Sequence, residues 1–93
     1  MKIISPMTKP FENSSLEMIC EVTGSPRPKR YWMINNVVEK NCKNLDVSCK
    51  LVITSIQFDK HNGDFTCIAS NHIGNTSDTV RVEVQGMLFI RIV

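Results

Sequence analysis

The sequence has no apolar run of the length that a membrane-spanning helix needs, about 20 residues. Its first ten residues, MKIISPMTKP, also lack the apolar core of about 7 to 15 residues that a secretion signal carries. We therefore expect no membrane span within these 93 residues, and either a fragment of a longer protein or a cytosolic chain.

An excess of charge of one sign is missing as well. Eleven Lys and Arg stand against nine Asp and Glu, which leaves a formal charge of +2 and argues against nucleic acid as a partner. The chain contains no nucleophile elbow, no H-E-x-x-H motif, no phosphate-binding glycine loop and no C-x-x-C pair. Its two histidines, His61 and His72, lie in predicted turns. The sequence predicts no enzyme activity, no metal site and no cofactor.

Helical periodicity is nearly absent, and strand-like patterns take its place. Apolar residues are placed to line one face of a strand in five segments, at residues 16–22, 30–35, 49–54, 65–70 and 79–84. Gly24, Pro26 and Pro28 separate the first two segments with a turn. Residues 71–74 predict a hairpin in which Gly74 supplies a positive φ. Seven or eight short strands with turns about every ten residues favour a β-sandwich or barrel.

Two cysteines, Cys20 and Cys67, lie on the inward faces of predicted strands, and Trp32 lies inward on a strand between them. By position alone, each cysteine is a small core residue, a metal ligand or half of a disulfide. Leu51 and Phe65 share these inward faces, GSPRP precedes the tryptophan, and CIASNHIG surrounds the second cysteine. Over about residues 10–84, this set resembles the I-set domains of the immunoglobulin superfamily.

The resemblance implies an all-β fold, an immunoglobulin-like β-sandwich of two antiparallel sheets. It also implies a disulfide between Cys20 and Cys67, packed on Trp32 in a core that includes Leu51 and Phe65. We expect one domain over residues 1–93, with its core at about 10–85 and an apolar tail at 86–93.

The chain departs from the family pattern at one corner and at one core position. The family places a tyrosine two residues before the second cysteine, where its hydroxyl bonds to the corner backbone; this chain has Phe65. The segment 56–63 is one residue longer than the pattern, so we expect an irregular loop there. Arg30 stands where an aliphatic residue is usual, and we expect its stem along the core edge with its charge outside.

The remaining cysteines, Cys42 and Cys49, have a spacing that suits two adjacent antiparallel strands joined by a loop. We expect a disulfide between them, and two disulfides indicate an oxidising compartment. The alternative is a pair of thiols in a cytosolic domain. Asn13 and Asn75 begin Asn-x-Ser/Thr sequons in predicted turns or strand edges, and both are predicted glycosylation sites.

Fold alone does not give function, so the functional hypothesis depends on the resemblance. It implies an extracellular or cell-surface protein-binding module of an adhesion or receptor protein, with a protein ligand or a homophilic partner. The alternative is a cytosolic structural domain of the kind found in giant muscle proteins.

Two surfaces are candidates for binding. Alternation places Tyr31, Met33 and Ile68 outward on neighbouring strands, where they would form an apolar patch with Arg81 and Glu83 at its rim. The second candidate is a basic cluster for a sulfated polysaccharide or an acidic partner, although a solvated turn is the simpler reading. It consists of Arg27, Lys29 and Arg30.

Overall fold

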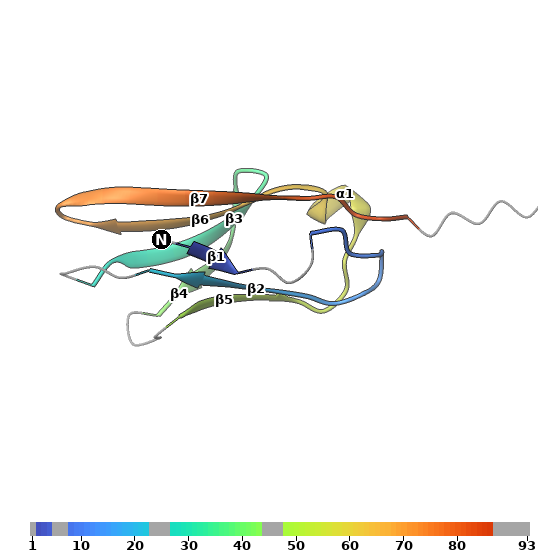
Figure 1. Ribbon diagram of the computed structural model, residues 1–93, viewed down its shortest axis with the longest axis horizontal. Helices are drawn as coiled ribbons and strands as arrows, with labels where there is room; N and C mark the ends of the chain where they lie inside the picture. The colour runs from blue at the N-terminus through green and yellow to red at the C-terminus, as the bar shows by residue number, and fades with distance from the viewer. Residues whose placement is uncertain (1, 5–7, 23–26, 44–47, 87–93) are drawn as a thin grey trace, which may run out of the picture.

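A computed structural model describes residues 2–4, 8–22, 27–43 and 48–86. The strands form two layers (Figure 1). One sheet has the order β1-β2-β5, made of β1 (Lys2–Ile4), β2 (Leu16–Glu21) and β5 (Cys49–Ile53). The other has the order β4-β3-β6-β7, made of β4 (Val37–Cys42), β3 (Lys29–Ile34), β6 (Gly63–Asn71) and β7 (Gly74–Val82). Neighbouring strands in both sheets are antiparallel, which confirms the predicted all-β sandwich.

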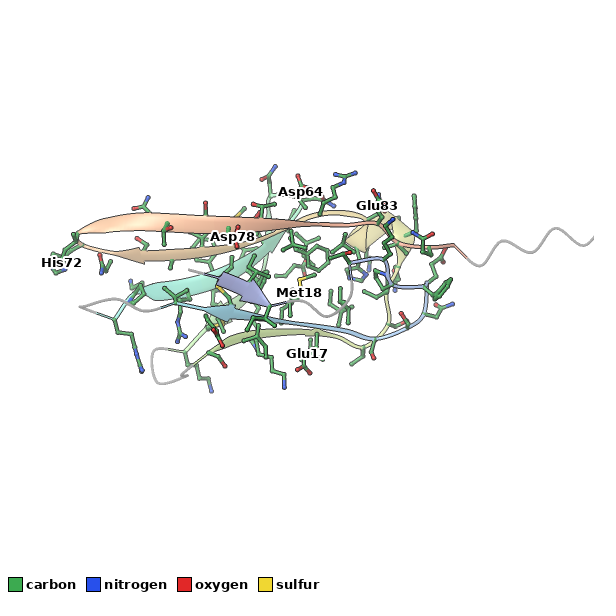
Figure 2. The ribbon with its side chains drawn as sticks, in the orientation of Figure 1. Glu17, Met18, Asp64, His72, Asp78 and Glu83 are labelled. Atoms are coloured by element: carbon green, nitrogen blue, oxygen red, sulfur yellow. A yellow bond between two sulfur atoms is a disulfide. The ribbon has the colours of Figure 1, made fainter. Side chains whose placement is uncertain are left out.

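The core lies between the two sheets because each central strand turns every second side chain inward. Along β2, Leu16, Met18 and Cys20 are buried while Glu17 and Glu21 are exposed. Figure 2 shows Met18 between the layers and Glu17 on the outer side. The core also holds the predicted Trp32, Leu51 and Phe65, the first and last without any exposed surface.

The hairpin between β3 and β4 is closed by two asparagines. Asn35 and Asn36 have φ of 48° and 67°, and Ile34 pairs with Val37 across the turn. Two positive-φ residues in a two-residue loop are the mark of a type I′ turn, whose twist matches that of the strands. The polar segment after β3 therefore begins with a tight turn and continues as β4, at the edge of its sheet.

The hairpin between β6 and β7 turns at residues 71–74, as expected, but a side chain and not a positive-φ glycine stabilises the turn. Gly63 has a positive φ and Gly74 does not, so the prediction for Gly74 is wrong. The turn is held instead by the Asn71 side chain, whose Oδ1 accepts hydrogen bonds from the backbone N of Ile73 at 2.9 Å and of Gly74 at 3.1 Å. An asparagine side chain that replaces a backbone acceptor in this way is a common turn former.

The corner before β6 is also more regular than expected. In place of an irregular loop, the chain forms one helical turn, α1 (Phe58–His61). His61 Nδ1 accepts a hydrogen bond from the backbone N of Gln57 at 2.8 Å, and this bond joins the two ends of the helical turn. A helical turn thus occupies the segment where an irregular loop was expected.

The fold extends beyond the predicted core limits at the N-terminal side. β1, at residues 2–4, pairs with β2, and Ile3 lies opposite Cys20. Further along, residues 8–12 run beside residues 83–85, since the backbone N of Glu83 donates to the carbonyl of Thr8 at 2.9 Å. Most of the predicted apolar tail, residues 87–93, lies outside the described residues. Within the described part of the chain, no helix has the length and apolarity to cross a membrane.

Candidate protein-interaction surface

A disulfide joins the two sheets at the centre of the core. Cys20 on β2 is bonded to Cys67 on β6, and neither residue has exposed surface. Trp32 lies opposite Cys67 in the register of β3 and β6 and is fully buried. Its indole Nε1 donates a hydrogen bond to the carbonyl of Cys49 at 3.1 Å, so the one polar atom of the ring has a partner.

A second disulfide joins Cys42 to Cys49. The two cysteines were expected on strands of one sheet, but β4 and β5 are edge strands of different sheets. The bond therefore holds the two layers together along one side of the sandwich. Next to it, Lys40 Nζ donates a hydrogen bond to the carbonyl of Lys50 at 2.6 Å and adds a second link between these edges.

The outer face of the larger sheet carries an apolar patch. Tyr31 and Met33 alternate with buried residues of β3, and Tyr31 lies opposite Ile68 of β6. All three are half-buried. Val38 of β4 lies opposite Met33 and is 50% exposed. We call Tyr31, Met33, Val38 and Ile68 the outer-face patch; sequence reasoning missed Val38, although the two-residue turn after Ile34 fixes its register.

The charged rim differs from the expected one. Arg81 borders the sheet face, but its Nη1 lies 3.5 Å from Asp64 Oδ1, which compensates its charge. A hydrogen bond between the hydroxyls of Thr66 and Thr79, at 2.9 Å, lies between this ion pair and the patch. Glu83 follows the end of β7 and pairs with Lys9 at 3.9 Å.

Glu83 is therefore not part of a rim around the outer-face patch. Figure 2 shows it at the end of the sandwich near α1, while His72 marks the hairpin tip at the other end. Its position was predicted by extending the alternation of β7 past Val82, but β6 begins at Gly63 and gives residue 83 no partner on this face.

The basic cluster is also corrected by the structure. Arg30 is 3% exposed, and its Nη2 donates a hydrogen bond to the carbonyl of Lys43 at 3.0 Å. The expectation that its charge stays outside is wrong, because Arg30 shares the inward parity of Trp32. Arg27 and Lys29 are exposed, and they line a shallow pocket of about 370 Å³ with Ser70, Asn71 and His72.

The opposite sheet presents a different outer surface. Glu17 and Lys50 form an ion pair at 3.3 Å across β2 and β5. Val52 is an exposed apolar residue of this face, at 51%. The predicted glycosylation sites are both accessible: Asn13 is exposed in the segment before β2, and Asn75 is exposed near the start of β7.

These observations define a class of protein: a disulfide-linked β-sandwich that exposes one sheet face and the end of one hairpin to solvent. In the described residues, no group of three or more His, Cys, Asp or Glu is placed to hold a metal ion. The family model for the immunoglobulin domain matches residues 2–71. The chain belongs to that family, whose members are in general non-catalytic modules.

Among curated proteins, this chain is similar to titin of Drosophila melanogaster, with 29% identity over 100 residues and 96% of this chain covered. It is 33% identical to palladin of Rattus norvegicus over 86 residues, with 85% covered. It is 29% identical to interference hedgehog of Drosophila sechellia over 74 residues, with 80% covered. The chain spans 14% of that palladin, 8% of that interference hedgehog and, to the nearest percent, 0% of that titin.

Solved structures show the same fold. A C. elegans twitchin kinase fragment with immunoglobulin domains superposes with a TM-score of 0.78 at 20% identity, covering 95% of this chain and 21% of that one. Sidekick-1 immunoglobulin domains 1–5 give 0.68 at 18% identity, covering 90% and 20%. The titin domains z1z2 in complex with telethonin give 0.69 at 22% identity, covering 92% and 50%.

Proposed function

We propose that this domain is an extracellular protein-binding module of a cell-surface adhesion or receptor protein, and that it binds its partner through the outer-face patch. The observation that carries the proposal is the placement of Tyr31, Met33 and Ile68 side by side, with the exposed Val38 beside them. Aromatic, Met and aliphatic side chains gathered on a flat sheet have the composition of an interface core. Solved structures of similar domains include complexes of titin with telethonin and of titin M10 with obscurin-like 1, which supports a protein as the class of partner.

We expect the double variant Tyr31→Ser, Ile68→Ser to lose partner binding while its unfolding free energy stays within about 1 kcal/mol of wild type, because surface changes are usually small. The measurement screens the multimerised domain against a displayed collection of cell-surface ectodomains that includes the domain itself. The matched control, Glu17→Lys with Glu21→Lys, changes the opposite sheet and leaves binding intact. Loss of binding in the control alone would place the interface on the other face.

The compartment rests on a separate set of observations. Both cysteine pairs are bonded, and structural disulfides persist in oxidising environments. Both sequon asparagines are exposed, so a transferase could reach them. The similarity to titin and palladin favours the alternative, a structural domain of a giant muscle-type protein in the cytosol.

On secretion from a eukaryotic host, we expect glycans at Asn13 and Asn75 and no cysteine open to alkylation before reduction. Intact mass, taken before and after enzymatic deglycosylation and alkylation, gives both counts. Asn13→Gln and Asn75→Gln should each remove one glycan without changing the fold. Full alkylation of all four cysteines in protein taken unreduced from its native source would favour the cytosolic alternative.

A further inference from the structure

The predicted glycosylation site at Asn75 lies on the same face as the outer-face patch. Asn75 is opposite Ser70 in the register of β6 and β7, and residues opposite each other point to the same side of a sheet. Ser70 is two residues beyond Ile68, so both use the outward side of β6. The exposed Asn75 side chain therefore leaves the sheet on the face that we propose for binding.

The distance from Asn75 to the patch is short. Asn75 and Ile68 are diagonal neighbours on adjacent strands, a relation that places their Cα atoms about 7 to 8 Å apart. Tyr31 lies one strand further, opposite Ile68, which puts it about 12 Å from Asn75 by the spacing of strands and residues. An N-linked glycan is bulky enough to extend over both side chains.

No large side chain separates Asn75 from the patch along the outward side of β7, which the structure describes throughout. The next outward residues of this strand are Ser77, which lies opposite Ile68, and Thr79. Both side chains are small. Arg81, the first long side chain in this row, comes after them at the far end of the strand. A glycan at Asn75 can thus lie over the patch without displacing a protein side chain.

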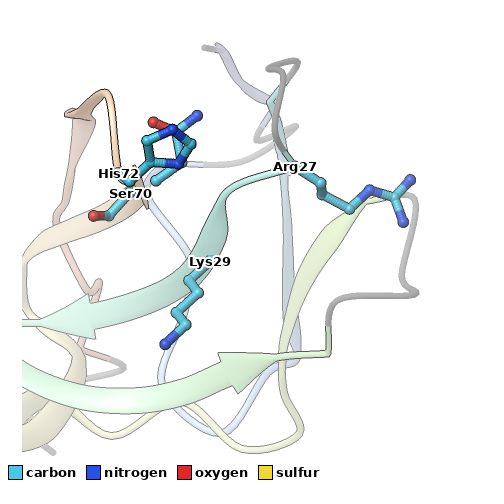
Figure 3. A pocket seen from close by; sticks show the side chains of 5 residues that line it. Arg27, Lys29, Ser70 and His72 are labelled. Atoms are coloured by element: carbon cyan, nitrogen blue, oxygen red, sulfur yellow. The ribbon is translucent and has the colours of Figure 1, made fainter.

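The surface on the sheet side of Asn75 offers hydrogen-bond donors to a sugar. Ser70 and Lys29 continue the row of Asn75 across β6 and β3. Both line the shallow pocket beside the hairpin tip, together with His72 (Figure 3). A hydroxyl and an ammonium group can both donate to sugar oxygens, so they favour a glycan that lies across the sheet over one that extends from its edge.

A covalent attachment makes even weak contacts of this kind effective. A group joined to the domain by a short flexible link is present at an effective concentration of about the millimolar range. A partner that arrives from solution must displace the glycan or bury less of the patch. Covering also suits a soluble domain, because a contiguous apolar patch that stays exposed promotes unwanted association.

We infer that a glycan at Asn75 covers the outer-face patch and lowers its affinity for the partner, so that the state of this site regulates binding. A glycan at Asn13 has no such effect. Asn13 lies before β2 of the other sheet, and its backbone N donates to the carbonyl of Ile56 at 2.8 Å. The inference rests on the proposed function, because it concerns the regulation of that binding site.

The first test measures access to the patch without any partner. Tyr31 is the only tyrosine in the chain, and the four cysteines are bonded, so nitration by tetranitromethane reports on the patch alone. In protein secreted from a eukaryotic host, we expect Tyr31 to be nitrated several-fold more slowly in wild type than in Asn75→Gln or Ser77→Ala. These two variants remove the same sequon through different residues. The rate is read from the mass of the peptide that contains Tyr31.

Two controls separate the glycan from the substitutions. Asn13→Gln removes the other glycan and should be nitrated at the wild-type rate. Enzymatic trimming of wild type to one sugar at each site should raise the rate toward that of Asn75→Gln with no change of sequence. Each protein is checked for an unchanged melting temperature first.

The second test repeats the ectodomain screen with the same proteins. We expect Asn75→Gln to bind its partner at least about tenfold more tightly than glycosylated wild type, and Asn13→Gln to bind as wild type does. Tyr31→Ser with Ile68→Ser, added to Asn75→Gln, should abolish the gain.

Three results would overturn the inference: an unmodified Asn75 in the secreted protein, equal nitration of Tyr31 with and without the Asn75 glycan, or an equal gain on removing the Asn13 glycan. Failure of the proposed function has a different signature. If Tyr31 is shielded but no ectodomain binds any form, the cover is upheld and the proposed function fails. If a partner needs Tyr31 and Ile68 but binds both glycoforms equally, the proposed function stands and the regulation is refuted.

Discussion

Replacing Gly63 with alanine is expected to lower the free energy of unfolding by about 3 to 5 kcal/mol. Gly63 has a φ of +141°, a conformation that residues with a side chain rarely adopt. An added Cβ would also lie 2.0 Å from Asn35 Oδ1 and 2.7 Å from Asn35 Cγ, well inside van der Waals contact. Backbone strain and steric overlap act at the same position. A shift of the Asn35 side chain would relieve the overlap but would leave the backbone strain.

Asn35 cannot simply rotate away from the new methyl group. Its Oδ1 accepts a hydrogen bond from the backbone N of Asp64 at 2.9 Å, and its Nδ2 donates to the carbonyl of Asn62 at 2.9 Å. Its own backbone N donates to the carbonyl of Asp64 at 2.9 Å. Moving the side chain breaks two of these bonds, each worth about 1 kcal/mol.

These bonds tie the β3–β4 turn to the start of β6, at the corner where the family pattern has a tyrosine hydroxyl and this chain has Phe65. Asn62 extends the tie, because its Oδ1 accepts a hydrogen bond from the backbone N of Val84 at 2.9 Å. Two asparagine side chains thus hold a corner that the phenylalanine cannot bond.

Urea unfolding of Gly63→Ala beside Gly74→Ala measures the effect. No atom lies within 4 Å of a Cβ added at Gly74, so its change should stay within about 1 kcal/mol of wild type. The double variant Asn35→Ala, Gly63→Ala removes the overlap but keeps the backbone strain, and should be less destabilised than the sum of its single variants. Equal stabilities for Gly63→Ala and Gly74→Ala would contradict the role assigned to Asn35.

The predictions that depended on alternation within a strand agree with the structure, because burial in a two-layer sandwich has the period of a strand. The rim position of Glu83 was wrong because this residue lies past the end of β7. Met18, Trp32 and Phe65 point inward for the same reason that Glu17 and Tyr31 do not. Membership of the immunoglobulin family agrees as well, since the spaced cysteines and tryptophan report on one core.

Features held by contacts distant in sequence were not predictable in the same way. Parity places Arg30 on the inward face of β3, but a guanidinium stays buried there only with a hydrogen-bond acceptor, and the carbonyl of Lys43 that accepts from it lies thirteen residues further along. The short β1 has too few residues to show a pattern, and its place follows from pairing with β2. Asn35 and Asn36 did carry a readable signal, because asparagine tolerates positive φ and two residues make the tightest hairpin.

Replacing both Cys20 and Cys67 with alanine is expected to have the other large effect, about 4 kcal/mol or more, and to prevent folding at physiological temperature. The bond closes a loop of 47 positions, and the entropy that a cross-link removes from the unfolded chain grows with loop length. Both sulfurs are also fully buried beside Trp32, so their removal leaves unfilled space in the core.

The second disulfide provides a matched comparison, because replacing Cys42 and Cys49 with alanine also removes two sulfur atoms from the same fold. Cys42 and Cys49 are only seven positions apart, which predicts a loss of about 2.5 kcal/mol on the same chain-entropy model. Cys42 is half-buried at an edge of the sandwich whereas Cys49 is fully buried, so water can reach the space left by this pair only at its Cys42 end. Thermal unfolding of the two double-alanine variants should therefore rank the central pair as more costly. If the edge pair proved equally costly, loop entropy would not govern the difference, and the link between edge strands β4 and β5 would be as important to the sandwich as its core.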